Sequence, residues 1–187
     1  MSTIARFSVK EYERIVATGV FGGKNRRRIE LIRGELREMN PIGSYHARTV
    51  DRLTDWSYDV APRTRFQVRV QNPLAFLTVD SEPEPDVVWA KCKDYGDEHP
   101  AADDVLLLIE VADSSLDHDR GEKAEMYAEA GIADYWVVNV VDSTVEVRRD
   151  PDGGRYRSVR PFGAGETVQP LAAPEPRLIV DSLFAES

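Results

Sequence analysis

The most constraining feature of this sequence is a charged residue inside an apolar run. Residues 105–111 read Val-Leu-Leu-Leu-Ile-Glu-Val, so Glu110 interrupts a segment whose composition is typical of a buried β-strand. Burying a carboxylate costs free energy unless a cation, a hydrogen-bond donor or a metal ion compensates it. The chain continues through a polar turn and a helical segment to a second apolar run that ends near residue 140. Residues 105–140 therefore predict a strand–helix–strand unit, with Glu110 as a candidate functional residue.

The composition indicates an ordinary soluble globular protein and predicts one domain over residues 1–187, since 42% of the residues are hydrophobic and 30% are charged. The single cysteine, Cys92, excludes an internal disulfide and a cysteine-cluster metal site, which fits a reducing cytoplasm. No apolar run approaches the ~18 residues of a membrane span, and the N-terminus lacks a signal-peptide pattern. We therefore expect a cytoplasmic protein with no membrane partner. The net charge of −9 argues against a non-specific nucleic-acid coat protein, although 24 Lys and Arg residues allow a local basic groove.

Periodicity and turn signals predict an α/β (α+β) fold. The pattern indicates an N-terminal helix over 8–19 capped by Ser8, a β-hairpin over 28–39 that turns at Arg33-Gly34, and a helix over 45–59 that Ser44 can cap. A strand follows over 86–89. Two further strands, 144–149 and 155–159, flank Pro-Asp-Gly-Gly and predict a C-terminal hairpin. We expect the Pro-rich tail from 161 to 187 to be irregular.

The strand around residues 65–70 alternates apolar side chains with Arg65, Gln67 and Arg69. Its basic edge is either a solvated face or a surface that contacts phosphates.

The helix of the central unit bears a lysine on its inward side. Asp119 and Glu122 have capping-box spacing, so we expect the helix to begin near Arg120, and Gly131 is a suitable residue to end it. Residues 123, 126, 127 and 130 form the apolar stripe that should pack against the sheet. Lys123 therefore either lies inward near Glu110 or forms an exposed pair with Asp119 one turn earlier. Spacing alone does not distinguish these two arrangements.

Asp86, Glu110 and Lys123 form one possible catalytic cluster. Carboxylates on adjacent strands supply the oxygen ligands that Mg²⁺ prefers. A bound metal ion would lower the pKa of a water molecule and neutralise charge on a phosphoryl oxygen, and a nearby lysine would stabilise the transition state. Asp86 has an alternative role, because a carboxylate at the start of a strand often accepts hydrogen bonds from backbone amides. His46, at the start of an apolar stripe, is by itself more typical of a packing residue than of a ligand.

Five sequence motifs follow one another along the chain. These are IELIRGEL, a Ser-x-His at a helix start, PEPDVVW, LLLIEV and DRGEKAEMYAEAGIADYWVV. Together they resemble the Uma-type restriction-endonuclease family, which belongs to the PD-(D/E)XK nuclease superfamily. The resemblance extends from about residue 9 to Phe184, and the segment DRGEK…Y…AG…YW is its most specific part.

The resemblance implies a restriction-endonuclease-like mixed β-sheet flanked by helices and a metal-dependent phosphodiester cleavage site. It makes Pro85-Asp86 the Pro-Asp element and Glu110 the second acid, with both as ligands of Mg²⁺ or Mn²⁺. In the orthodox superfamily pattern the lysine lies two residues after the second acid, where this chain has Ala112. In the Uma-type variant it lies on the following helix, where Lys123 matches it. Three further residues match family positions around the same pocket and are candidate catalytic auxiliaries: Glu30, Glu35 and His46.

One departure from the family pattern lies beside the expected site. The family usually has Ser-Pro after the strand that carries the second acid, whereas this chain has Ala112-Asp113-Ser114-Ser115 after the strand of Glu110. The change affects the turn but removes no charged member of the site.

The resulting expectation is an endonuclease acting on nucleic acid, with DNA as the expected substrate, in the form of a homodimer because related nucleases commonly pair to cut two strands. The alternative is a nuclease-like binding or regulatory module with little or no catalysis, since fold does not establish function.

Overall fold

A computed structural model describes residues 3–22 and 27–185, and its centre is a six-stranded mixed β-sheet. The strand order is β3-β4-β5-β6-β7-β8, and the β5–β6 pair is parallel whereas the other neighbouring pairs are antiparallel. The strands are β3 (Phe66–Val70), β4 (Val87–Lys91), β5 (Val105–Ala112), β6 (Asp134–Asn139), β7 (Thr144–Asp152) and β8 (Arg155–Phe162). A mixed sheet flanked by helices confirms the predicted fold class.

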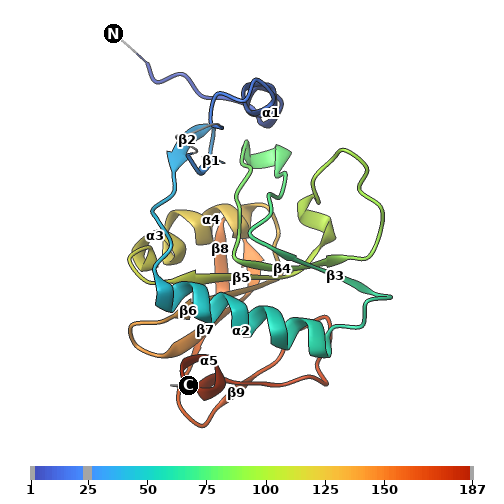
Figure 1. The fold of residues 1–187 in the computed structure, drawn as a ribbon, viewed down its shortest axis with the longest axis vertical. Helices are drawn as coiled ribbons and strands as arrows, with labels where there is room; N and C mark the ends of the chain where they lie inside the picture. The colour runs from blue at the N-terminus through green and yellow to red at the C-terminus, as the bar shows by residue number, and fades with distance from the viewer. Residues whose placement is uncertain (1–2, 23–26, 186–187) are drawn as a thin grey trace.

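Helices cover both faces of the sheet (Figure 1). Helix α2 (Ser44–Val60) and the C-terminal α5 (Val180–Phe184) lie on one face, where Leu53 of α2 joins a core that includes Trp89 and Trp136. Helices α3 (Leu116–Arg120) and α4 (Glu122–Glu129) lie on the other face. Strand side chains alternate between these two cores, as a sheet that is buried on both faces requires.

The central unit differs from its prediction at the start of the helix. Residues 116–129 form two short helices that meet at Gly121, and neither has a side-chain cap. A side chain at Gly121 would bring its Cβ within 2.8 Å of the carbonyl oxygen of Asp117, so glycine permits the close turn between the helices. The prediction that Asp119 caps the helix is wrong, because Asp119 is buried inside α3 and accepts a hydrogen bond from Ser115. Gly131 follows α4 with a positive φ of 86°, as predicted.

The N-terminal part forms the predicted helix and hairpin. Helix α1 (Val9–Ala17) begins at Ser8, and Ser8 and Glu11 make a reciprocal capping box. Strands β1 (Ile29–Ile32) and β2 (Glu35–Glu38) pair with each other in a separate two-stranded sheet. Arg33 and Gly34, with φ of 50° and 77°, make the turn between them. Ile29 and Leu31 pack with Val9 and Tyr12 of α1.

Two further predictions need correction. Ser44 lies inside α2, and Gly43 occupies the capping position without a side-chain hydrogen bond. The tail is more regular than predicted, because β9 (Thr167–Val168), β10 (Leu178–Ile179) and α5 lie within it. Buried Val168, Leu178 and Leu183 hold it against the core under α2, so packing contacts give this Pro-rich segment its order.

The C-terminal hairpin is confirmed and is longer than predicted, with Gly153 and Gly154 at its turn. Among the described residues, 3-10 turns lie at Leu77–Val79 and Ala102–Asp104. Cys92 is exposed just beyond β4. No helix within the described residues is long and apolar enough to span a membrane.

Candidate active site

Strand β5 directs Glu110 toward the α4 side of the sheet. Leu108 and Ala112 belong to the core under α4, whereas Ile109 and Val111 belong to the core under α2. Glu110 shares the face of Leu108 and Ala112 because side chains alternate along a strand. It is only 4% exposed and accepts a hydrogen bond of 2.7 Å from the Tyr127 hydroxyl. The strand thus fixes a carboxylate beneath the helix that carries Lys123.

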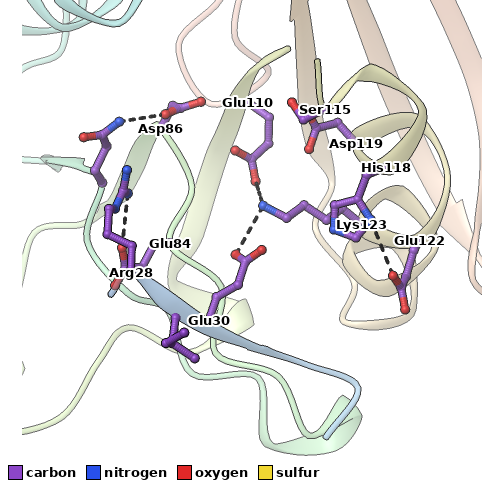
Figure 2. A network of polar contacts seen from close by, with 12 residues as sticks. Arg28, Glu30, Glu84, Asp86, Glu110, Ser115, His118, Asp119, Glu122 and Lys123 are labelled. Atoms are coloured by element: carbon purple, nitrogen blue, oxygen red, sulfur yellow. Dashed lines mark hydrogen bonds and ion pairs between the residues drawn. The ribbon is translucent and has the colours of Figure 1, made fainter. Parts of the chain in front are cut away.

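Lys123 lies between two glutamates (Figure 2). Its Nζ is 3.1 Å from Glu110 Oε1 and 3.3 Å from Glu30 Oε2, and the lysine is 4% exposed. Burial lowers the pKa of Lys123, but the charges of Glu110 and Glu30 outweigh burial and raise it well above its usual range. Burial raises the pKa of Glu110, and Lys123 partly opposes that rise. Lys123 is therefore a buried ammonium group and not the exposed partner of Asp119.

Asp86 is held in one orientation by three donors. The Val111 backbone N–H donates to Oδ2 at 2.8 Å, His46 Nε2 lies 3.1 Å from Oδ2, and the Gln71 amide donates to Oδ1 at 3.0 Å. Burial raises the pKa of Asp86, but the hydrogen bond and the charge of His46 lower it below its usual value. Burial lowers the pKa of His46, whereas Asp86 raises it, and the rise prevails. The two groups therefore favour an ionised carboxylate beside an imidazolium.

These residues surround a cavity of about 330 Å³. Most of the expected site residues line it: Glu30, His46, Asp86, Glu110 and Lys123. Glu35 does not line the cavity, and it pairs instead with Arg6 at 3.0 Å and with Arg37 at 2.6 Å. Residues separated by almost a hundred positions in the sequence thus meet at one cavity, and Glu35 contacts the lining residue Arg37.

Asp119 also lines the cavity, and the sequence analysis missed it as a site residue. It is 3% exposed, and its Oδ2 accepts a hydrogen bond of 2.6 Å from Ser115. Its spacing of four residues from Lys123 was a usable signal, because positions i and i+4 share one face of a helix. The capping-box spacing of Asp119 and Glu122 predicted instead that Asp119 caps the helix. Choosing between a capping residue and an i,i+4 partner of Lys123 requires knowing where the helix begins.

The carboxylates of the cavity fit a divalent cation of the Mg²⁺ type. Both hydrogen bonds that Glu110 accepts end on Oε1, so among the described residues Oε2 has no hydrogen-bond donor. Asp86 has three donors for its four lone-pair positions. Within the described part of the chain no group of three or more His, Cys, Asp or Glu side chains could hold a metal ion alone. Mg²⁺ commonly keeps several waters and uses one or two carboxylates, so the pair suits it.

Comparison with solved structures shows the class of fold. The structure resembles a crystal structure described as "a putative nuclease belonging to DUF820" from Anabaena variabilis, with a TM-score of 0.74 and 16% sequence identity. The match covers 95% of this chain and 97% of that one, which shows a shared nuclease-like fold. No curated protein matches the sequence significantly.

The family follows from the sequence itself. The family described as "Uma2: Putative restriction endonuclease" matches residues 9–180, and the chain belongs to that family. The resemblance found in the sequence motifs is thereby confirmed.

Proposed function

We propose that this protein is a metal-dependent endonuclease that hydrolyses phosphodiester bonds of nucleic acid. The observation that carries the proposal is the meeting of Asp86, Glu110 and Lys123 at one cavity. Membership of the Uma2 family and the shared nuclease-like fold support the same activity.

Each residue has a role that follows from its surroundings. Asp86 and Glu110 would hold Mg²⁺ or Mn²⁺, which when bound supplies Lewis-acid stabilisation of a phosphoryl oxygen and acidifies a water molecule. His46 and Gln71 orient Asp86, and Tyr127 fixes Oε1 of Glu110. The Lys123 ammonium donates a hydrogen bond to negative charge that develops on the reacting oxygens. Glu30 keeps Lys123 charged, since it is the second carboxylate beside Nζ.

The remaining expectations belong to the same proposal. We take residues 1–187 as one domain, which is supported by the family match over residues 9–180. DNA as the substrate and a homodimer as the active form come from the nuclease superfamily, and a cytoplasmic location comes from the single cysteine.

A second candidate is a binding module with the same fold and no catalysis. The observation that favours it is the position of Lys123, whose charge is already matched by Glu30 and Glu110. The net charge of −9 also disfavours strong binding to a polyanion.

The experiment that separates the two candidates is cleavage of supercoiled plasmid with Mg²⁺ or Mn²⁺. Wild type should convert the plasmid to nicked and linear forms, whereas Asp86→Asn and Lys123→Met should not. Lys91→Met is the matched control, because Lys91 lies at the far end of β4 and is half-exposed. Cleavage that survives in both site variants would show a contaminating nuclease, and a wild type that never cuts would favour the binding module.

A further inference from the structure

The β1–β2 hairpin has a polar side that forms one wall of the cavity. Glu30 pairs with Arg37 in the hairpin register, and cross-strand partners point to the same face. Arg28 lies two residues before Glu30 and so shares that face. Ile29 and Leu31 point the other way, into the apolar cluster with α1. Arg28, Glu30 and Arg37 all line the cavity, as the alternation requires.

Phosphate groups of a substrate need cations in the cavity other than Lys123 and His46. The Lys123 side chain is 5% exposed and is held between two glutamates at the proposed cleavage centre, whereas the side chains of Arg28 and Arg37 are 28% and 43% exposed. His46 faces Asp86 in the same way. A nucleic-acid strand carries one negative charge on each phosphate, and binding requires cationic side chains that meet several of them. In the lining of this cavity Arg28 and Arg37 are the remaining permanently charged cations.

Each arginine is anchored through a single nitrogen. Arg28 donates from Nη2 to Glu84 at 3.2 Å. Arg37 donates from Nη2 to Glu35 at 2.6 Å and to Glu122 at 3.3 Å. The three carboxylates lie outside the lining of the cavity. Since a guanidinium has five N–H donors, Nε and Nη1 of both arginines remain without a hydrogen bond to any described residue.

We propose that Arg28 and Arg37 bind neighbouring backbone phosphates of a nucleic-acid strand, next to the phosphate that is cleaved. The carboxylates occupy Nη2 of each guanidinium, which leaves the N–H groups of Nε and Nη1 free to donate to phosphate oxygens. Arg37 is diagonal to Arg28 across the hairpin, with roughly 7–8 Å between the two positions, so their side chains can reach neighbouring phosphates of one strand. The inference rests on the proposed function, since it assigns the substrate contacts of the same site.

Strand β3 is a weaker candidate for this role. Its basic side chains, Arg65 and Arg69, do not line the cavity, and Arg65 lies over the ring of Phe66 at 5.1 Å. Arg65 and Gln67 are exposed and Arg69 is half-buried, and neither arginine extends the lining of the cavity.

The test measures binding of fluorescein-labelled 20-nucleotide DNA, single-stranded and duplex, by fluorescence anisotropy over a range of salt concentrations. The full-length protein is used with Ca²⁺ as the metal ion, and a gel checks that the probe stays intact. For single strands, Arg28→Gln/Arg37→Gln should reduce the slope of log Kd against log salt by about 1.4, at about 0.7 per phosphate contact. Affinity at 0.1 M salt should fall by about fivefold for each arginine on the same basis. Arg157→Gln is the control, because Arg157 is an exposed arginine paired with Asp152 on the distant C-terminal hairpin.

The conservative double variant Arg28→Lys/Arg37→Lys keeps the charges and should keep the salt slope. This variant also protects the test if the glutamine variant fails to fold, as judged by its melting temperature. An unchanged slope and affinity in Arg28→Gln/Arg37→Gln, or an equal loss in Arg157→Gln, would overturn the inference. Arginine-dependent binding by a protein that never cleaves DNA would sustain the inference and remove the nuclease proposal. If wild type cleaves DNA and neither binding nor cleavage depends on these arginines, the nuclease proposal stands and the inference falls. Absence of any DNA binding would overturn both proposals.

Discussion

At the scale of single residues, the cavity holds more negative than positive charge. Glu30, Asp86, Glu110 and Asp119 are all at least nine-tenths buried, whereas Lys123 and His46 supply the cations that face them. Burial raises the pKa of Glu110 and Lys123 opposes the rise, so the ionised carboxylate depends on a neighbouring cation. A divalent cation would restore the balance of charge, which explains physically why this cluster suits a metal site.

Another buried glutamate, Glu82, lies outside the cavity and predicts how the stability of the protein depends on pH. Glu82 is 5% exposed, and burial, assisted by the charges of Glu13 and Glu84, raises its pKa from 4.5 to about 7. The folded state therefore binds this proton more tightly than the unfolded state, so the stability that Glu82 contributes is lost as pH rises from about 4.5 through 7. Glu82→Gln removes this loss. The free energy of unfolding of the variant should gain on that of wild type by up to about 3 kcal/mol between pH 4.5 and 8.

Urea denaturation at both pH values measures this difference. Glu98→Gln, an exposed glutamate in the loop after β4, serves as the control and should follow wild type. A constant difference between Glu82→Gln and wild type would show that the pKa of Glu82 is not raised in the folded protein.

At the scale of elements, the sequence predicted the hairpin and the strand–helix–strand unit because each depends on local signals. Each of these signals depends only on residues that are close in the sequence: the Arg33-Gly34 turn, the apolar run around Glu110, and the helix-ending Gly131. How the hairpin docks was not predictable from these signals. Its position depends on contacts between distant segments, such as the pairing of Leu31 with Glu82 and the ion pair between Arg33 and Glu129. The resemblance to a family, not local pattern, indicated that Glu30 and His46 belong near the site.

The close approach at Gly34 gives a prediction for this element. Gly34 and Gly131 both have positive φ, so alanine at either position costs roughly 1–2 kcal/mol of backbone strain. A Cβ at Gly34 would also lie 2.8 Å from Arg6 Cβ and 3.0 Å from the carbonyl oxygen of Phe7, whereas nothing lies within 4 Å at Gly131. Gly34→Ala should therefore destabilise the protein by about 1–3 kcal/mol more than Gly131→Ala. Thermal unfolding of the two variants tests this, and equal losses would show that the segment before α1 moves away freely.

At the scale of the whole molecule, the sheet brings the metal-binding candidates together from neighbouring strands. Asp86 precedes β4 and Glu110 lies in β5, so a metal ion bound to both would link two central strands of the sheet. A ligand that binds only the folded state stabilises it in proportion to the logarithm of its concentration. Metal binding should therefore be visible as a change in the unfolding of the entire chain.

We expect Mg²⁺ at tenfold its dissociation constant to stabilise the protein by about 1.4 kcal/mol, which corresponds to a rise in Tm of roughly 3–6 °C. Glu110→Gln should abolish the rise, whereas Glu166→Gln, a glutamate on the exposed C-terminal segment, should keep it. Differential scanning calorimetry with Mg²⁺ or with EDTA measures the effect. A rise of the same size in Glu110→Gln would place the metal ion elsewhere.

The exposed cysteine after β4 has a practical consequence for optical work on this protein. Because Cys92 is the sole thiol in the sequence and is exposed, a maleimide dye would attach at one position without prior engineering. Six residues of nearly extended chain separate it from Asp86, which is a distance of about 20 Å. A donor dye at Cys92 is therefore close enough to the candidate site for energy transfer to an acceptor dye on a bound oligonucleotide. The transfer would report the approach of a substrate.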